Sequence, residues 1–412
     1  MLVEAAVLVM GGLLFHEVVV LVLLQRGIRH TVERRDFDET GNGQYMVVIP
    51  VYKESSIIES TLEYFDSWAS ENLVESIYVV TTEKEARDGD YPTRSTVEEY
   101  IQEHESTNVE LIHYPYNDGG KAHQVNYAVD LVENVEDYKV LIYDADSRPE
   151  PKSLQALEKT ESYAVEQQYP VYTKGIPDGQ SAWLAYALYQ TRRTFFYEIP
   201  NTEKQFSGTA FLPHYVIGHG LSVDGSFLEK HPLPENTLIE DLEYGYQLDA
   251  EGIPVAPTYS FDICETPQSL SRVFRQASVW MYADIASNIR MYGDRPPLKP
   301  MLKSFYLLFW TTRTPLYGFS VLTLFFTVPW LGILSVSALI LALGAQLHFL
   351  TKGLARIGLR TFSITPSLLY HYVKRTVLDS LPAVYLSFRL LRKKLYTDEP
   401  FYDKTRRNKD VS

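Results

Sequence analysis

The sequence predicts an α/β domain with a mainly parallel sheet, flanked on both sides by apolar helices that cross or lie on a membrane. Two observations support this fold class. Between residues 44 and 265, short β-rich runs alternate with helical patterns, as they do in strand–helix–strand units. Outside that region, apolar residues gather into long runs near the two ends of the chain, and these runs match the thickness of a bilayer.

The composition excludes several classes of protein. The chain has 412 residues, of which 45% are hydrophobic, so it can bury a sizeable core in one or two domains. Its 52 acidic against 38 basic residues give a net charge of -14. Nucleic-acid binders usually carry a basic face, so we expect no nucleic-acid partner. Cys264 is the single cysteine, which permits no intrachain disulfide and no Cys-based zinc site.

The N-terminal apolar run covers residues 2 to 24 and is long enough to span ~30 Å of hydrocarbon. We assign residues 1–25 to a transmembrane helix, because a cleaved signal peptide would have a basic start and a shorter apolar region. His16 and Glu17 interrupt the run, and either a functional role or packing against other helices explains them. The arginines that follow predict that residue 30 onward is cytoplasmic: Arg26, Arg29, Arg34 and Arg35.

The C-terminal part of the chain predicts a second membrane element. Residues 313–350 are apolar and are divided at Pro329-Trp330, which indicates a transmembrane helical hairpin. Within the final segment, 351–412, we expect an amphipathic interface helix over 366–391 and then a cytoplasmic tail. That helix has charged residues among apolar ones: Lys374, Arg375 and Asp379. The prediction is a multi-pass protein of the cell membrane, with about three spans and a cytoplasmic central domain.

Five strands are expected in the central domain: Tyr45–Pro50, Ser76–Thr81, Val109–Tyr114, Lys139–Tyr143 and Pro170–Thr173. Polar residues follow the first and the fourth of them: Tyr52-Lys53-Glu54 and Asp144-Ala145-Asp146. Ligands of parallel sheets bind at the carboxyl ends of strands, so both segments are candidate ligand sites. No glycine-rich phosphate loop of the Rossmann or Walker type is present.

Asp144 and Asp146 suit a hard divalent cation, Mg²⁺ or Mn²⁺, because such ions are usually held by one or two carboxylates together with substrate phosphates. The same spacing occurs in Asp36-Phe37-Asp38 and in Asp88-Gly89-Asp90, which we interpret as solvated acids. Position separates the three, because only the pair at 144 and 146 ends an apolar strand.

Two further patterns have both a functional and a structural explanation. Glu240-Asp241 begins a helical stretch, where acids complement the helix dipole, although a carboxylate there could also accept a proton from a hydroxyl group. Gln276 and Trp280 are four residues apart and share one helix face, and the aromatic ring suits the apolar face of a sugar. Packing of Trp280 in the core is the alternative.

Together these motifs resemble those of the membrane-integrated members of glycosyltransferase family 2. This group contains cellulose, chitin and hyaluronan synthases and many lipid-linked sugar transferases. The likeness covers roughly residues 45 to 410. The matching segments follow in the family's order: Ile49-Pro50-Val51-Tyr52-Lys53-Glu54, Gly120-Lys121-Ala122 with Asn126, Asp144-Ala145-Asp146, Gly218-His219-Gly220, Glu240-Asp241, Gln276 to Trp280, and Tyr402 with Lys404-Thr405-Arg406.

The resemblance implies a GT-A type nucleotide-sugar-binding domain over 44–265, acceptor-side interface helices over 266–312, and inverting transfer from a nucleoside-diphosphate sugar. It also assigns residues to roles. The catalytic residues would be Asp241, as general base, and Glu240. The residues that bind the nucleotide sugar would be Pro50, Tyr52, Glu54, Lys121 and Asp144, with Asp146 as the metal ligand. The acceptor would be bound by Gly218, His219, Gly220, Gln276 and Trp280.

Two departures from the family's pattern bear on the substrates. After the second strand, where an aspartate commonly helps to hold the nucleoside, this chain has Thr81-Thr82-Glu83-Lys84, which weakens the case for uracil. Val279 stands where processive synthases have an arginine, and three spans provide few helices for a polysaccharide channel. A lipid-linked or membrane-presented saccharide acceptor is therefore favoured. The alternatives are a processive polysaccharide synthase and a non-catalytic nucleotide-sugar-binding subunit, and a homo-oligomer stays open.

Overall fold

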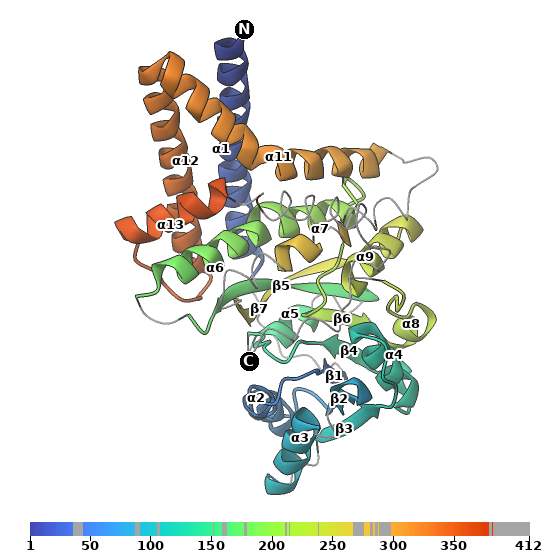
Figure 1. Cartoon of the computed structure of the whole chain (residues 1–412). Helices are drawn as coiled ribbons and strands as arrows, with labels where there is room; N and C mark the ends of the chain where they lie inside the picture. Colours follow the sequence, from blue (N-terminus) through green and yellow to red (C-terminus); the bar gives the residue numbers. More distant parts are fainter. Residues whose placement is uncertain are drawn as a thin grey trace.

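A sheet-based domain carries long helices that rise from one side of it, and the N-terminus lies at the far end of the first helix (Figure 1). This arrangement is seen in a computed structural model of the whole chain. The structure describes residues 1–35, 44–86, 91–104, 108–150, 152–158, 163–176, 179–210, 212–213, 215–237, 239–266, 276–280, 283–284, 287, 298–378 and 381. The Asp-x-Asp segments at 36 and 88, residues 382–391 and the segment 402–406 lie outside this part of the chain.

The sheet has seven strands in the order β3-β2-β1-β4-β6-β5-β7. Strands β1 to β4 are parallel to one another, β6 runs antiparallel between β4 and β5, and β5 pairs with β7 in parallel. The prediction of an α/β fold with a mainly parallel sheet is confirmed. The strands are β1 (Tyr45–Pro50), β2 (Ser76–Thr82), β3 (Val109–Tyr114), β4 (Lys139–Ile142), β5 (Val165–Lys174), β6 (Leu221–Asp224) and β7 (Ala256–Glu265).

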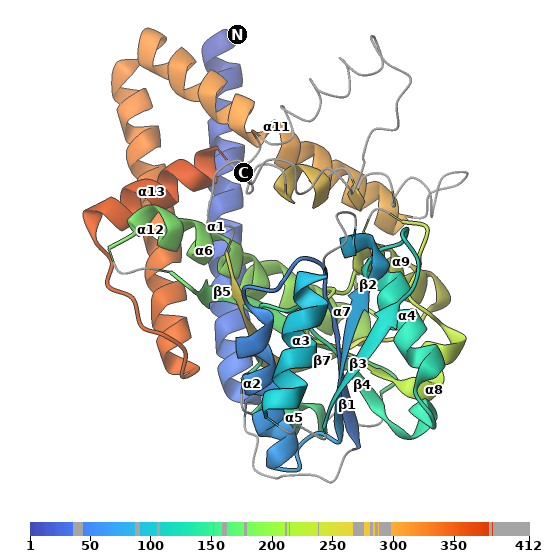
Figure 2. The same cartoon turned by 60° about the horizontal axis from the view of Figure 1, so that its bottom comes forward.

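Helices cover both faces of the sheet, which explains why β1 is buried and apolar along its whole length. In β1, Val47 and Ile49 pack towards α2 and α3, while Met46 and Val48 pack towards α4. Figure 2 shows α2 and α3 on one side of the strands and α4 on the other. The helices of the domain are α2 (Ile58–Ser70), η1 (Glu83–Ala86), α3 (Pro92–Glu103), α4 (Lys121–Leu131), η2 (Val135–Asp137), α5 (Ser153–Glu158), α6 (Ser181–Arg193), η3 (Thr194–Glu198), α7 (Ile199–Phe206), α8 (Gly225–Lys230) and α9 (Glu240–Glu251).

Two helices in the described part of the chain are long and apolar enough to cross a membrane, α1 (Leu2–Arg34) and α12 (Pro329–Arg356). The third long helix, α11 (Leu298–Thr327), is not among them, so three spans are not established. It ends at Thr327, and Val328 separates it from α12. The last described helix is α13 (Pro366–Val377), which lies across the long helices (Figure 1).

Helix α1 is docked into the sheet domain along its second half. A Cβ atom on Gly27 would lie 1.9 Å from the carbonyl oxygen of Phe195, so only glycine allows this approach. At the end of the helix, both guanidinium amino groups of Arg35 donate to the carboxylate of Glu150, at 2.8 and 2.5 Å. These contacts hold the domain at a fixed orientation beneath the apolar helices.

Glu17 is fully buried between the long helices. Its carboxylate accepts hydrogen bonds from the Tyr317 hydroxyl and from the Gln346 amide, both at 3.0 Å. Buried acids need such partners, so the structure explains this residue by packing between α1, α11 and α12.

Candidate active site

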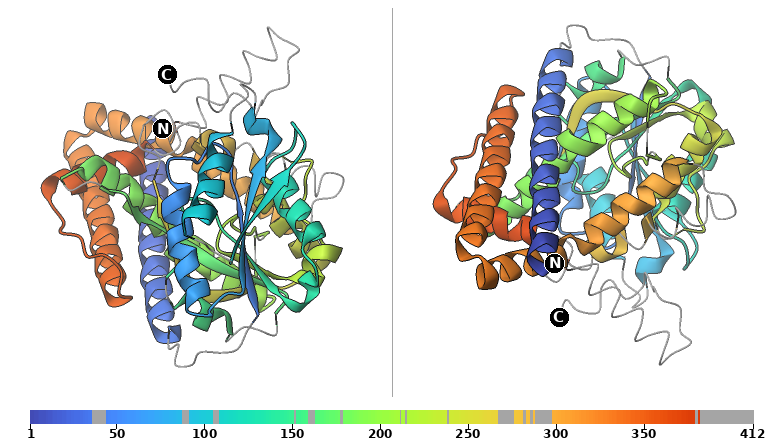
Figure 3. Two further views of the ribbon diagram at one scale, coloured as in Figure 1. Left: turned by 90° about the horizontal axis from the view of Figure 1, so that it is seen from below. Right: turned by 90° about the horizontal axis from the view of Figure 1, so that it is seen from above.

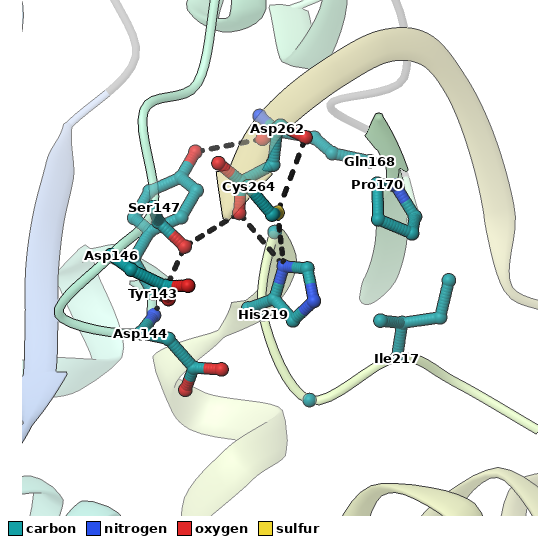
Figure 4. A network of polar contacts seen from close by, with 12 residues as sticks. Tyr143, Asp144, Asp146, Ser147, Gln168, Pro170, Ile217, His219, Asp262 and Cys264 are labelled. Atoms are coloured by element: carbon teal, nitrogen blue, oxygen red, sulfur yellow. Dashed lines mark hydrogen bonds and ion pairs between the residues drawn. The ribbon is translucent and has the colours of Figure 1, made fainter. Parts of the chain in front are cut away.

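The turn after β4 carries Asp144 and Asp146, and strand β7 holds it in place. The Ser147 hydroxyl donates to Oδ2 of Asp262 (2.6 Å), and the amide N–H of Arg148 donates to Oδ1 of the same residue (2.9 Å). Asp262 is fully buried in β7. The two carboxylates at 144 and 146 are therefore presented by a backbone that Asp262 holds in place (Figure 4).

The electrostatics of this turn suit a bound cation. Burial raises the pKa of Asp146 to about 6, and the negative charge of Asp144 adds to the rise. Two carboxylates held together by the fold repel each other, and a cation placed against them relieves that repulsion. An all-oxygen pair of ligands matches the preference of Mg²⁺ and Mn²⁺. The residues present thus fit a hard divalent cation.

Lys121, the first residue of α4, joins this turn to the loop that contains Gly218. Its ammonium group donates to the carboxylate of Asp144 and to the carbonyl oxygen of Gly218. Burial alone lowers the pKa of Lys121, but the negative charges of Asp144 and Glu240 outweigh it and raise that pKa. The residue remains a cation in the centre of the site.

Asp241 lies in the first turn of α9, where its carboxylate accepts two backbone hydrogen bonds. The N–H of Gly218 donates to Oδ2 and the N–H of Leu242 donates to Oδ1, both at 2.7 Å. Burial raises the pKa of Asp241 to about 6, and the neighbouring charge of Glu240 adds to the rise. A carboxylate that is both fixed and more basic than usual is suited to accept a proton.

The Gly218-His219-Gly220 turn links Asp241 to strand β7. The imidazole Nδ1 of His219 lies 2.8 Å from Oδ2 of Asp262. Burial lowers the pKa of His219, but the hydrogen bond and the charge of Asp262 outweigh it and raise this pKa to about 9. Gly220 adopts a φ of +63°, which favours glycine. The contact with Asp262 places the imidazole of His219 beside the carboxylates of Asp144 and Asp146 (Figure 4).

The residues after β1 form the other side of the site. Pro50 is the buried last residue of the strand, and the ammonium groups of Lys53 and Lys84 lie 5.6 and 5.7 Å from the centre of the Tyr52 ring. The backbone N–H of Glu54 donates to a threonine hydroxyl of α3. Two cations beside an aromatic ring at the carboxyl ends of β1 and β2 suit a nucleotide.

Gln276 and Trp280 lie one turn apart in a helical segment, as their spacing predicts. The residues just beyond them contact the helix that carries Asp241. Ala283 packs with Tyr246 of α9, and the hydroxyl of Tyr246 donates to the carboxylate of Asp284. Through these contacts the segment is placed against α9.

The sequence and the fold were compared with known proteins. A model described as glycosyltransferase like family 2 matches residues 42–283. The chain belongs to this family. The predicted membership of glycosyltransferase family 2 and the nucleotide-sugar glycosyltransferase assignment that follows from it are confirmed.

One of the similar solved structures supports the GT-A fold of this family 2 glycosyltransferase. A mannosyltransferase from Pyrobaculum calidifontis in complex with GDP-Man and Mn²⁺ matches 97% of this chain and 100% of its own, with a TM-score of 0.54 and 18% identity. Glucosyl-3-phosphoglycerate synthase from Mycobacterium tuberculosis, solved with Mn²⁺, UDP and phosphoglyceric acid, matches 62% of this chain and 80% of its own, with a TM-score of 0.37 and 14% identity. No curated protein matches the chain significantly.

Two residues of the glycosyltransferase site are absent from the sequence-based assignment. Asp262 supports the Asp144–Asp146 turn and His219, and a signal for it exists, because an acid in the middle of an apolar strand needs buried partners. Lys84 joins Tyr52 only because β1 and β2 are neighbours, which the chain order alone does not specify.

Proposed function

We propose that this glycosyltransferase transfers a sugar, with inversion, from a nucleoside-diphosphate sugar to a lipid-linked or membrane-presented saccharide. One observation carries the proposal. Lys121 donates to Asp144 and to the carbonyl of Gly218, while the N–H of Gly218 donates to Asp241. The donor-side carboxylate and the candidate base are thereby joined through one lysine and the backbone of one glycine.

In this mechanism Asp241 is the general base. As the acceptor oxygen attacks the anomeric carbon, the hydroxyl proton moves to the carboxylate of Asp241. The bond from the anomeric carbon to the diphosphate breaks on the opposite face, which inverts the configuration. With a pKa of about 6, Asp241 is mostly ionised at neutral pH and is still basic enough to take the proton.

Asp146, with Asp144 beside it, would hold Mg²⁺ or Mn²⁺, and such an ion neutralises the negative charge that develops on a leaving diphosphate. The solved mannosyltransferase supports this role, because it contains Mn²⁺ and GDP-Man. Tyr52 with its two lysines would contact the nucleotide, and Lys121 would add positive charge near the diphosphate.

We propose that the acceptor reaches the site along the membrane surface, and the exposed side chains of α11 support this. The first half of α11 has an exposed apolar stripe with helical spacing: Leu298, Met301, Phe305 and Leu308, which are 62, 43, 62 and 59% exposed. This half runs across the domain, and the helix then turns to run beside α1 and α12 (Figures 1 and 3). The stripe would lie in the membrane interface, and the second half of α11 would form a third span with α12.

The test is release of nucleoside diphosphate by the full chain in lipid nanodiscs, with a nucleotide-sugar panel, Mg²⁺ or Mn²⁺, and a lipid extract. We expect one donor to turn over and Asp241→Asn to reduce turnover by about 10²–10⁴-fold while donor binding is kept. Asp137→Asn is the matched control, because it alters an exposed Glu-Asp pair in η2.

The other results of this assay are informative as well. Binding of a donor with metal but without turnover would favour a nucleotide-sugar-binding subunit. A ladder of products from one acceptor would favour a processive synthase. Full turnover by Asp241→Asn would remove Asp241 from the role of base.

A further inference from the structure

A second cluster of metal-ligating groups lies beside the Asp144–Asp146 turn. It consists of His219, Asp262 and Cys264, whose ligand atoms all lie within 4.8 Å of one another. The three residues come from two elements, the Gly218–Gly220 turn and strand β7, and their side chains point towards one another (Figure 4). The proposed reaction makes no use of the thiol.

The distance between the sulfur and the nitrogen ligand of the cluster matches a tetrahedral zinc site. Zinc binds imidazole nitrogen at about 2.0–2.1 Å and thiolate sulfur at about 2.3 Å, so two such ligands of one ion lie about 3.5 Å apart. The observed distance from Sγ of Cys264 to Nδ1 of His219 is 3.6 Å. The distance from Nδ1 to Oδ2 of Asp262 is 2.8 Å and would have to open by about half an ångström.

The outer shell of such a site is already built. Metal-ligating carboxylates are normally hydrogen-bonded to other groups, which fixes their orientation. Asp262 accepts from the Ser147 hydroxyl and from the Arg148 amide, and it is fully buried. Cys264 is 3% exposed, while the side chain of His219 keeps 14% exposure and borders the carboxylates of the active site.

We propose that His219, Asp262 and Cys264 form a zinc site that inhibits the enzyme when it is occupied. The donor set of one nitrogen, one oxygen and one sulfur selects Zn²⁺ over Mg²⁺ and Mn²⁺, which prefer oxygen ligands. The site is a mixed one with a single thiolate, so it differs from the Cys-based zinc sites that one cysteine excludes. The thiol and the imidazole nitrogen give up their protons to the solvent when the ion binds.

Inhibition follows from what the ion would touch. The ion replaces one proton on the imidazolium of His219 and one on the thiol of Cys264, so the net charge next to Asp146 stays the same and the inhibition has a geometric cause. The ion moves Nδ1 of His219 away from Oδ2 of Asp262, which now lies 2.8 Å from it. It also ties the Gly218–Gly220 turn to β7, and the amide of Gly218 is the group that holds Asp241. This part of the inference rests on the proposed function, whereas the metal site itself does not.

Cobalt titration tests the site directly. Co²⁺ replaces Zn²⁺ in such sites, and a bond from Co²⁺ to thiolate produces a charge-transfer band in the near-ultraviolet. Because Cys264 is the single cysteine of the chain, the band has one source. We expect the full chain at pH 8, without nucleotide, to bind one Co²⁺ with this band and to lose the band when Zn²⁺ is added.

Variants make the result specific. Cys264→Ser should abolish the band and weaken Zn²⁺ binding at least tenfold, and His219→Gln should also weaken it, whereas Asp146→Asn should keep the band. Unchanged circular dichroism would show that each variant is folded. A Co²⁺ spectrum without the thiolate band in the folded wild-type chain would overturn the site.

The inhibitory role has its own readout. Zn²⁺ should inhibit Mn²⁺-supported turnover of the wild type. The Cys264→Ser variant should need at least tenfold more Zn²⁺ for the same inhibition, and its activity without zinc should equal that of wild type. Equal inhibition of the two proteins would overturn the inhibitory role. If no donor turns over at all, the proposed function fails, and the cobalt titration still decides the site.

Discussion

The pH dependence of turnover tests the assignment of Asp241 as general base. Its pKa is raised from 3.8 to about 6, chiefly by burial and then by Glu240. With a pKa of about 6, the ionised fraction of Asp241 falls from about nine-tenths at pH 7 to about one-tenth at pH 5. Turnover should therefore fall about tenfold over this range. With a pKa of 3.8, turnover would be almost constant between the same limits.

The assay is kcat from pH 4.5 to 8 in nanodiscs, at saturating donor, acceptor and metal. Saturation is required because the pKa of Asp146 is also about 6, so acid weakens metal binding in the same range. kcat then reports groups in the enzyme–substrate complex. A circular dichroism spectrum at each pH separates loss of turnover from unfolding.

Glu240→Gln makes the test specific to the electrostatics of α9. Removal of this negative charge lowers the pKa of Asp241, so the acid limb of the profile moves to lower pH and turnover at pH 5 rises relative to pH 7. Glu136→Gln, in an exposed Glu-Asp pair of η2, should leave the profile unchanged. An acid limb near pH 4 in the wild type, or one that Glu240→Gln does not move, would refute the reasoning.

Two further predictions concern packing. A Cβ on Gly218 would lie 2.8 Å from Oδ2 of Asp241, so Gly218→Ala should reduce kcat at least tenfold while donor affinity changes little. Gly318→Ala is the control and should match wild type, because a Cβ there would have no atom within 4 Å. Lys303 is 1% exposed and pairs with a buried aspartate at 3.0 Å, so Lys303→Met should lower the free energy of unfolding by about 3–5 kcal/mol. Lys299→Met, at a 42% exposed ion pair, should cost at most about 1 kcal/mol, and equal melting temperatures for the two variants would contradict this account.

The strands that sequence reasoning locates are those with apolar side chains on both faces. β1 and β3 have the predicted bounds, and β2 and β4 differ by one residue. β5 begins at Val165, five residues before the predicted Pro170. The prediction missed these residues because Glu166, Gln167 and Gln168 are polar, although the fold buries them. Their polarity reflects partners elsewhere in the fold, such as the Lys139 ammonium that pairs with Glu166 at 2.7 Å.

Strands β6 and β7 were not predicted, and both matter for the site. β6 is four residues long and antiparallel to its neighbours, so it breaks the alternation of strand and helix on which the fold prediction depends. β7 contains Asp262 at a position where an apolar residue is expected. The acid is there because it holds Ser147, Arg148 and His219, which are more than 40 residues away in the sequence.

The predicted hairpin shows that average hydropathy locates the break between two helices better than it locates the start of a helix. The break beside Pro329 lies where the sequence places it, between α11 and α12. The predicted start at residue 313 is too late, because α11 begins at Leu298. The helix has buried charged residues, Lys303 and Arg313, which contact the domain. Charged residues on the inner face lower the average hydropathy of this helix, although its outer face is apolar.

Gly218 explains why the motifs of this site depend on one another. Its N–H orients Asp241, its carbonyl oxygen receives Lys121, and the next residue contacts Asp262 below the Asp144–Asp146 turn. Both backbone groups belong to one residue, so a shift of this turn disturbs both contacts. Lys121 also bonds to Asp144, and both residues belong to elements other than this turn, so the donor side keeps that contact when the turn shifts. A change at Gly218 should therefore reduce kcat more than donor affinity.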